Sequence, residues 1–289
     1  MTSGHATPTM KRRRIGDLLK LLRTAVHVTA KDAARLAGLD ATRLGRIEQG
    51  RYKVTSTQVK ALLDAYGVSD EVTRSALCQA TEESPRAGWW HQYRDELTEP
   101  YLDYTALESE AVTIQAQHPV VIPGLVQCAS YVRGTLQQSI HPPTRARADA
   151  LFAVRMTRQQ VLTRPVRPTK LHVVIPEAAF FAQFEAGPSV MRDQLRHLVT
   201  LSEQGNITVQ VLALESPPNF GLHQAANLLT FDAPWPSVLH FDNWRGGTLS
   251  HDQEEIAAMK QHFDQLSKVA LSVEKSRDLM EERLRKGMK

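Results

Sequence analysis

The sequence predicts a multidomain protein, with an all-α bundle of five helices followed by an α/β domain that has a small sheet and a long C-terminal helix. Its 289 residues are 42% apolar, enough to form two buried cores. Apolar residues recur at three- and four-residue spacing through the first 80 residues. After residue 165, short β-branched runs alternate with helical segments.

The first two helices follow from apolar spacing and from capping residues. A helix is expected from about Arg13 to Val26, because its apolar residues form one stripe: Ile15, Leu18, Leu19 and Leu22. Thr29 is the expected N-cap of a short second helix, which Gly38 ends. The alanines of this second helix allow it to approach its neighbours closely.

The third helix carries the candidate functional face of the bundle. Asp40 is expected to cap it and Gly50 to end it. Leu44 and Ile47 point inward, whereas the outer face presents polar side chains: Thr42, Arg43 and Arg46. A fourth helix over residues 57–67 and a fifth that begins near Asp70 close the bundle.

Charge is divided unevenly along the chain. Residues 1–60 hold 13 Lys and Arg against 4 Asp and Glu, whereas the remaining residues hold 22 against 27. A basic first segment indicates a polyanionic partner for that segment alone. No apolar run approaches the length of a membrane span or follows the N-terminal basic cluster as in a signal peptide, so we expect double-stranded DNA, and no membrane, as the partner.

The two cysteines, Cys78 and Cys128, lack metal-binding spacing and are expected to be reduced, as in a cytoplasmic protein that is nucleoid-associated when bound to DNA.

The most specific fragment is the run RIEQGRYKVTSTQVKALLDAYGV. With the helices before it, it resembles the helix-turn-helix domain of the phage lambda repressor and Cro type, the Xre family, over residues 15–68. The resemblance implies a transcription regulator that binds a DNA operator as a homodimer, and it implies a structural pair between Glu48 and Arg23. It places near the DNA these residues: Ala30, Ala41, Thr42, Arg43, Arg46, Arg51 and Lys53.

Geometry divides the roles of these residues. The first turns of a recognition helix reach base edges, so Thr42, Arg43 and Arg46 are expected to read bases. Residues of the following loop, Arg51 and Lys53, are expected to contact phosphates. The alternative is that the arginines only solvate an exposed face. The basic arm from Lys11 to Arg14 either contacts the DNA, through Arg14 among others, or is a frayed tail.

The polar stretch Thr81–Arg86 is the candidate boundary between domains over residues 11–80 and 87–285. In the second domain, helices are expected over Tyr104–Gln115, Cys128–Leu136 and residues 146–162, followed by four strands with one amphipathic helix between the first two. Residues 252–285 are expected to be helical. Their apolar stripe is either a dimer seam or the face of a helix that lies on its own sheet.

The second domain contains the runs VVIPGLVQ, VRMTRQQVL and VMRDQLRHL, and a tryptophan pair at its start. From Trp89 to Arg283 it is similar to the uncharacterised domain that follows the helix-turn-helix in many actinobacterial regulators. The resemblance implies a regulator, in some cases antitoxin-like, whose C-terminal domain binds a small acidic partner protein encoded nearby. A small-molecule effector is the competing hypothesis.

Four residues are candidates for binding that partner or effector: Trp89, Trp90, Arg155 and Arg158. The tryptophans could instead fill the core, and the arginines could instead be solvated or paired internally.

Enzyme motifs are lacking: the sequence has no HExxH, no paired cysteine motif, no glycine-rich phosphate loop and no GxSxG. The run HQAANLLTFD from His223 is faintly similar to a phosphodiesterase half-motif, but Ala225 replaces the lysine. His240 lies near a strand end, and His251, Glu254 and Glu255 crowd the start of the last helix. We expect no catalytic residues, no metal and no cofactor, and keep a phosphodiesterase-like enzyme as a remote alternative.

Overall fold

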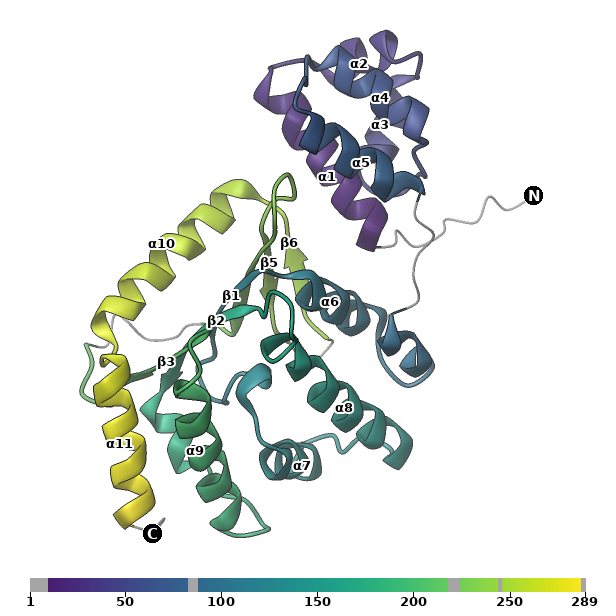
Figure 1. Cartoon of the computed structure of the whole chain (residues 1–289). Coiled ribbons are helices and arrows are strands. Elements are labelled where there is room, and N and C mark those ends of the chain that lie inside the picture. Colours follow the sequence, from purple (N-terminus) through teal and green to yellow (C-terminus); the bar gives the residue numbers. More distant parts are fainter. Residues whose placement is uncertain (1–9, 83–87, 218–223, 244–245, 287–289) are drawn as a thin grey trace. The chain divides into compact units, whose positions relative to one another are not determined.

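The computed structural model describes residues 10–82, 88–217, 224–243 and 246–286 (Figure 1). The described residues fall into two compact units. The first ends at Gly88 and also includes Phe231–Pro236, and the second holds the rest from Trp89 onward. No helix among the described residues is long and apolar enough to cross a membrane.

The first unit is a bundle of helices, as predicted. Its helices are α1 (Met10–Ala25), α2 (Ala30–Leu36), α3 (Ala41–Glu48), α4 (Ser56–Ala65) and α5 (Glu71–Glu82). One apolar cluster joins them, and it includes Leu19, Leu44, Leu62 and Leu77, each fully buried. The expected stripes therefore form the core.

Capping side chains set where these helices begin. The Thr29 and Asp40 side chains accept hydrogen bonds from backbone N–H groups in the first turns of α2 and α3, which confirms both expected caps. At α4, Thr55 and Gln58 form a reciprocal capping box.

The basic segment Lys11–Arg14 belongs to α1 and is neither an extended arm nor a frayed tail. Met10, at the first position of α1, is buried, so the apolar face of the helix extends further toward the N-terminus than the expected start near Arg13. Packing of that face keeps the segment helical.

The second unit is built on a six-stranded mixed sheet. In chain order its strands are β1 (Thr113–Gln117), β2 (Lys170–Pro176), β3 (Ile207–Leu212), β4 (Ala226–Thr230), β5 (Val238–Phe241) and β6 (Thr248–Ser250). The spatial order is β3-β2-β1-β4-β5-β6. Strands β1, β2 and β3 are parallel to one another, whereas β4 and β5 pair antiparallel with their neighbours.

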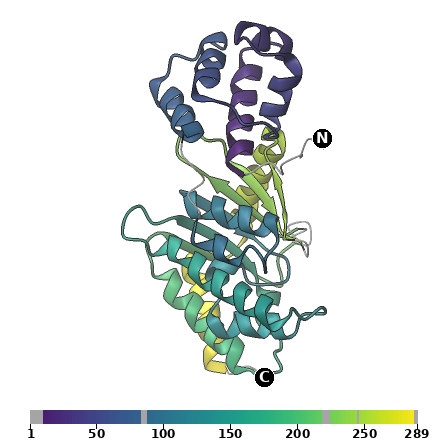
Figure 2. The ribbon, with the colours of Figure 1, turned by 90° about the vertical axis from the view of Figure 1, so that its right-hand side faces the viewer.

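Helices cover both faces of this sheet. These are α6 (Glu99–Glu110), α7 (Ala129–Gln137), α8 (Arg145–Arg158), α9 (Ser189–Ser202), α10 (Gln253–Val269) and α11 (Val273–Lys286). Figures 1 and 2 place α10 on the opposite face of the sheet from α6, α7 and α8. Single 3-10 turns, η1 (Trp89–Tyr93) and η2 (Gly124–Val126), precede α6 and α7.

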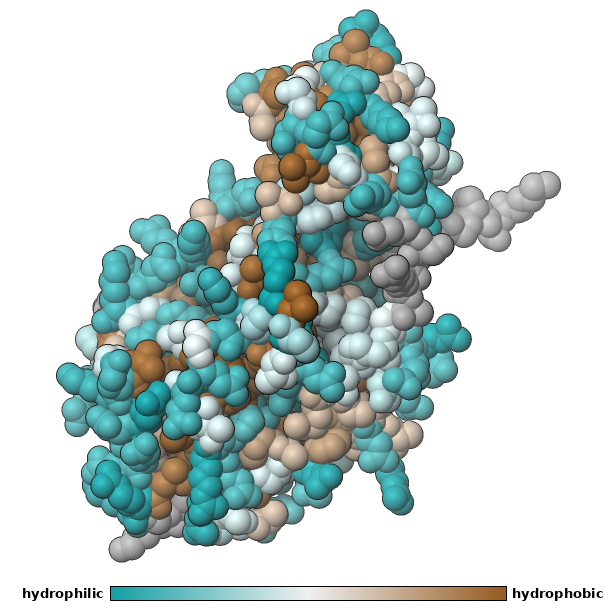
Figure 3. All heavy atoms as spheres, in the orientation of Figure 1, coloured by the Kyte–Doolittle hydropathy of each residue, from teal (hydrophilic) through white to brown (hydrophobic). Residues whose placement is uncertain are grey.

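The apolar stripe of α10 packs against the sheet of its own unit. Ile256 packs against Leu228 and Leu239, and Phe263 packs against Val174, so the helix lies on its own sheet. In Figure 3, hydrophilic residues cover most of the surface over α10 and α11. These contacts support the second of the two alternatives for the stripe.

The helical C-terminal segment is confirmed, with a break between α10 and α11. The Leu271 backbone N–H donates to the Val211 carbonyl oxygen, and the Val211 N–H donates to Ser276 Oγ, both at 2.9 Å. The break therefore satisfies backbone groups of β3, the edge strand of the sheet.

Strands β1 and β6 were not predicted. The expected helix over Tyr104–Gln115 ends at Glu110, and residues 113–117 form a central strand of the sheet. Ile114 and Ala116 alternate as buried residues, and the strand is stabilised by pairing with β2 and β4. Those partners lie far along the sequence, so local periodicity did not reveal the strand.

Candidate DNA-binding surface and ligand cavity

The outer face of α3 presents the expected base-reading residues. Thr42 and Arg46 are exposed, and Arg43 is partly buried, with its guanidinium 4.8 Å from the ring centroid of Tyr52. Arg51 and Lys53 are exposed on the loop that follows α3. The fold therefore brings four basic residues and Thr42 to one helix face and the loop beside it.

The scaffold beneath this face is held by a buried ion pair. Arg23 Nε donates to Glu48 Oε1 at 2.6 Å, and Arg23 Nη2 donates to Glu48 Oε2 at 2.9 Å. Arg23 also donates to the Val28 carbonyl oxygen. This confirms the structural pair that the resemblance implied, and the hydrogen bond with Glu48 raises the pKa of Arg23.

Close backbone contact between α1 and α3 fixes the angle of the recognition helix. A Cβ added at Gly16 would overlap the Ile47 carbonyl oxygen and lie 2.7 Å from that of Glu48. Only glycine permits this approach.

The position of Arg14 does not support the prediction that this residue contacts DNA. It is only 9% exposed, and its guanidinium lies 4.3 Å from the ring centroid of Phe231 and 4.8 Å from that of Trp235, in the segment that belongs to the same unit. Its side chain is held in the interior by these rings, so the predicted DNA contact is not supported. Ala30, another predicted contact, is partly buried at the start of α2.

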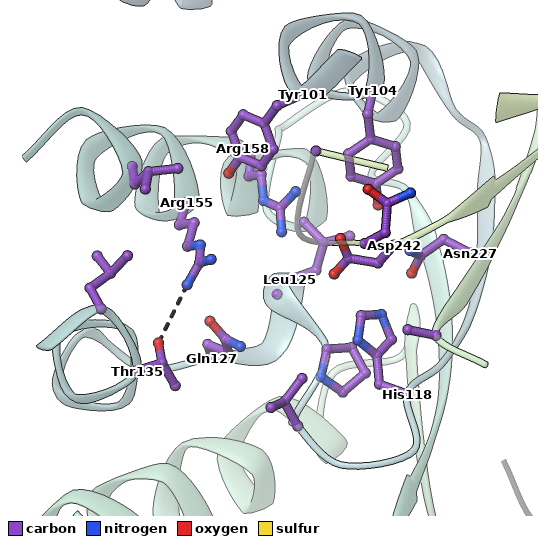
Figure 4. A pocket seen from close by; sticks show the side chains of 18 of the residues that line it. Tyr101, Tyr104, His118, Leu125, Gln127, Thr135, Arg155, Arg158, Asn227 and Asp242 are labelled. Atoms are coloured by element: carbon purple, nitrogen blue, oxygen red, sulfur yellow. Dashed lines mark hydrogen bonds between the residues drawn. The ribbon is translucent and has the colours of Figure 1, made fainter. Parts of the chain in front are cut away.

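The second unit contains a cavity of about 1350 Å³. Side chains of α6, α7 and α8, the loop between β1 and α7, and the strands β4 and β5 line it. Figure 4 shows polar side chains of α6, α7, α8, β4 and the loop between β1 and α7 facing one another. The volume is ample for a small molecule.

A buried ion pair forms one wall of the cavity. Arg158 Nε lies 3.5 Å from Glu108 Oε2, and Tyr104 Oη donates to Glu108 Oε1 at 2.7 Å. Burial raises the pKa of Glu108, although Arg158 opposes the shift. The Arg158 guanidinium packs against Gly124, where an added Cβ would overlap it.

Two neutral histidines lie at the strand end of the cavity. The Tyr104 ring stacks on His240, with centroids 3.8 Å apart, and Asn227 Nδ2 lies 3.3 Å from His240 Nδ1. Burial lowers the pKa of His240 to about 4, and it also lowers the pKa of His118, with nearby Asp242 opposing both shifts. Both imidazoles are therefore uncharged at neutral pH.

Comparison with known families divides the chain in two. Residues 14–77 match the family described as helix-turn-helix domain, and residues 101–282 match the family described as domain of unknown function (DUF5753). The chain belongs to the DUF5753 family. The helix-turn-helix match supports a DNA-binding regulator, in agreement with both resemblances seen in the sequence. No protein of curated function matches the chain.

The DUF5753 domain brings together two of the four residues predicted to bind a partner or effector. Arg155 and Arg158 both line the cavity, and Arg158 is paired with Glu108 inside the domain. Trp89 packs against the buried Leu97 and Val154, as expected of a core residue, and Trp90 stacks edge-on against it. The tryptophans are not among the cavity residues.

Sequence reasoning did not propose several polar residues of the cavity as site residues, among them Tyr104, Glu108, His118, Gln127, Asn227 and Asp242. Two of them, Gln127 and Asn227, stand in otherwise apolar, buried segments of the domain, and this is the signal that could have found them.

The structure provides no observation in favour of a catalytic site near His251. The described residues contain no group of three side chains suited to a metal ion. Near His251, Asp252 caps α10, and its side chain accepts from the N–H groups of Glu254 and Glu255. His223 lies outside the described residues.

Proposed function

We propose that the chain is a sequence-specific transcription regulator in which α3 reads DNA and the DUF5753 cavity binds a small-molecule effector. One observation carries the first part: Thr42, Arg43 and Arg46 lie together on the outer face of a capped helix whose inner face is packed into the bundle. Arginine is suited to paired hydrogen bonds with guanine, and threonine to contact with a thymine methyl group.

Tyr52 supports a role for Arg43 in reading bases. Its ring contacts the Arg43 guanidinium and limits the conformations that this long side chain can adopt, which lowers the entropy lost on binding. Arg51 and Lys53, on the adjoining loop, are assigned to phosphates.

The test is operator binding by the full chain, with duplexes first selected from a random library. We expect Arg43→Ala and Arg46→Ala each to weaken specific binding by about 1–3 kcal/mol and to relax the preference at one base position. Lys53→Ala should weaken binding to all duplexes alike. Lys275→Ala, at an exposed position on α11, is the matched control. Unchanged operator affinity in both arginine variants would refute the assignment.

The second part of the proposal rests on the cavity. Small-molecule sites are largely preformed, mostly apolar and supplied with a few convergent polar groups. The DUF5753 cavity has this composition, since Leu125, Leu136 and Leu151 line it together with the polar residues described above. We assign no catalytic reaction to this cavity. Turnover of a metabolite by the purified chain would contradict this assignment.

The second candidate function is antitoxin-like binding of a small acidic partner protein, which the resemblance implied. It predicts that the partner copurifies with the chain and is retained when cavity residues are substituted.

We further propose a homodimer on a two-fold operator, as is usual for helix-turn-helix proteins, and sedimentation of the DNA complex measures this stoichiometry.

A further inference from the structure

Arg155 is a half-buried cation of the cavity, and no acidic side chain in the described part of the chain pairs with it. Among the described residues its only hydrogen bond runs from Nη1 to Thr135 Oγ1, at 3.4 Å. The other buried cation, Arg158, is paired with Glu108. Figure 4 shows Arg155 beside Thr135 at one side of the cavity, with Asp242, Asn227 and His118 at the other. The donors of Arg155 are therefore available to an anionic ligand group.

Gln127 supplies an oriented acceptor to the same cavity. Its Nε2 donates to the Ile122 carbonyl oxygen at 2.7 Å, which fixes the orientation of the amide. Its Oε1 is buried and accepts no hydrogen bond within the described part of the chain, and the whole residue is only 5% exposed. A buried acceptor without a donor is costly, so a ligand O–H or N–H would stabilise this site.

The walls between these groups are apolar. Leu125 comes from η2, Leu136 from α7 and Leu151 from α8, and all three line the cavity. An inorganic ion would leave this surface unfilled, and a neutral hydrocarbon would leave Arg155 and Gln127 unused. The ligand must therefore combine an apolar body with both polar functions.

We propose that this cavity binds an amphipathic organic anion: Arg155 pairs with its acidic group, Gln127 Oε1 accepts its O–H or N–H, and the leucines enclose its apolar body. The inference rests on the proposed function only in taking the cavity as an effector site. Arg158 is paired with Glu108, and Arg147, which also lines the cavity, is exposed, so we assign discrimination for an anion to the half-buried Arg155.

Two fluorescent probes separate the acidic group from the rest of the ligand. 8-Anilinonaphthalene-1-sulfonate has a sulfonate, an N–H and apolar rings, and N-phenyl-1-naphthylamine is the same molecule without the sulfonate. Binding of each to the full chain is measured by titration without DNA. For Arg155→Gln we expect sulfonate-probe affinity to fall about tenfold or more, with neutral-probe affinity within about twofold of wild type.

Two further variants guard against a fold defect. Arg155→Lys keeps the charge and should retain most of the sulfonate-probe affinity. Arg145→Gln removes an exposed arginine of α8 that does not line the cavity and should change the affinity for neither probe.

The role of Gln127 is tested by displacing the neutral probe with 1-phenoxynaphthalene, whose ether oxygen replaces the N–H. We expect it to bind about fivefold more weakly.

Unchanged sulfonate-probe affinity in Arg155→Gln would overturn the proposal. So would equal loss of both probes, which would give Arg155 only a role in shaping the cavity. Displacement of the sulfonate probe by inorganic phosphate alone would contradict the claim that the ligand needs an apolar body. All of these readouts are independent of DNA, so failure of the proposed regulator function would appear separately, as lost operator binding.

Discussion

Each unit holds a buried ion pair that joins two of its helices, and the two pairs lie in different functional settings. In the first unit Arg23 and Glu48 connect α1 to α3 and lie beneath the DNA-binding face. In the second unit Glu108 and Arg158 connect α6 to α8 and form a cavity wall. Each partner removes the cost of burying the other, so a single substitution leaves an uncompensated charge.

We predict that Glu48→Ala lowers the free energy of unfolding of the first unit by about 3 kcal/mol, because Arg23 would remain buried without its carboxylate. The matched control is Asp64→Ala. Asp64 also pairs with an arginine, Arg74, at 2.8 Å, but its side chain is 67% exposed, and its loss should cost less than about 1 kcal/mol. Urea unfolding followed by circular dichroism measures both, and equal losses would contradict the prediction.

A pH dependence follows from His240. Its folded pKa of about 4 lies below the ordinary 6.5, so the unfolded chain binds the proton more readily. Stability from the neutral histidine is present above pH 6.5 and is lost as the pH falls toward 4. At pH 5 this loss is about 2 kcal/mol.

The measurement is thermal unfolding of wild type and His240→Gln between pH 7 and 5. The variant should show a shallower fall in unfolding free energy than wild type, with the remaining slope due to His118 and other groups. Parallel slopes would show that His240 titrates normally. His27→Gln, an exposed histidine of the first unit, is the control.

At the scale of elements, two helical glycines of the first unit differ in what surrounds them. Gly16 permits the backbones of α1 and α3 to touch, whereas a Cβ at Gly45, on α3 itself, would meet nothing within 4 Å. The two positions separate the effect of close packing from that of helix propensity.

We predict that Gly16→Ala destabilises the first unit by about 1–3 kcal/mol, because the added methyl group pushes α3 away from α1. Gly45→Ala should instead stabilise it by about 0.5–1 kcal/mol, since alanine favours a helix over glycine. Unfolding midpoints in urea measure both changes. Destabilisation of similar size at both positions would show that backbone contact is not what selects glycine at position 16.

At the scale of the whole molecule, the charge separation assigns DNA affinity to one unit. The basic excess lies in the first 60 residues, and the rest of the chain is acidic. The number of phosphates neutralised, and hence the salt dependence of binding, should therefore come from the first unit.

We predict that Arg51→Ala and Lys53→Ala each reduce the slope of log affinity against log salt by about one, as for one lost phosphate contact. Arg133→Gln and Arg192→Gln, in the second unit, should leave the slope unchanged. Anisotropy titrations at several salt concentrations measure the slope. A reduced slope in the second-unit variants would place phosphate contacts there too.

The sequence by itself determined the helical bundle, its caps, the outward arginines of α3 and most strands of the second unit. Those features depend on local periodicity and on capping residues such as Thr29 and Asp40, which are local in sequence. Only the tertiary structure decided that Thr113–Gln117 is a central strand, that Arg14 is buried, and that α10 lies on its own sheet. It also decided the cavity, because residues as distant as Glu108, Arg155 and His240 meet only when the sheet and its helices assemble. Pairing and burial across such separations depend on partners that no local pattern records.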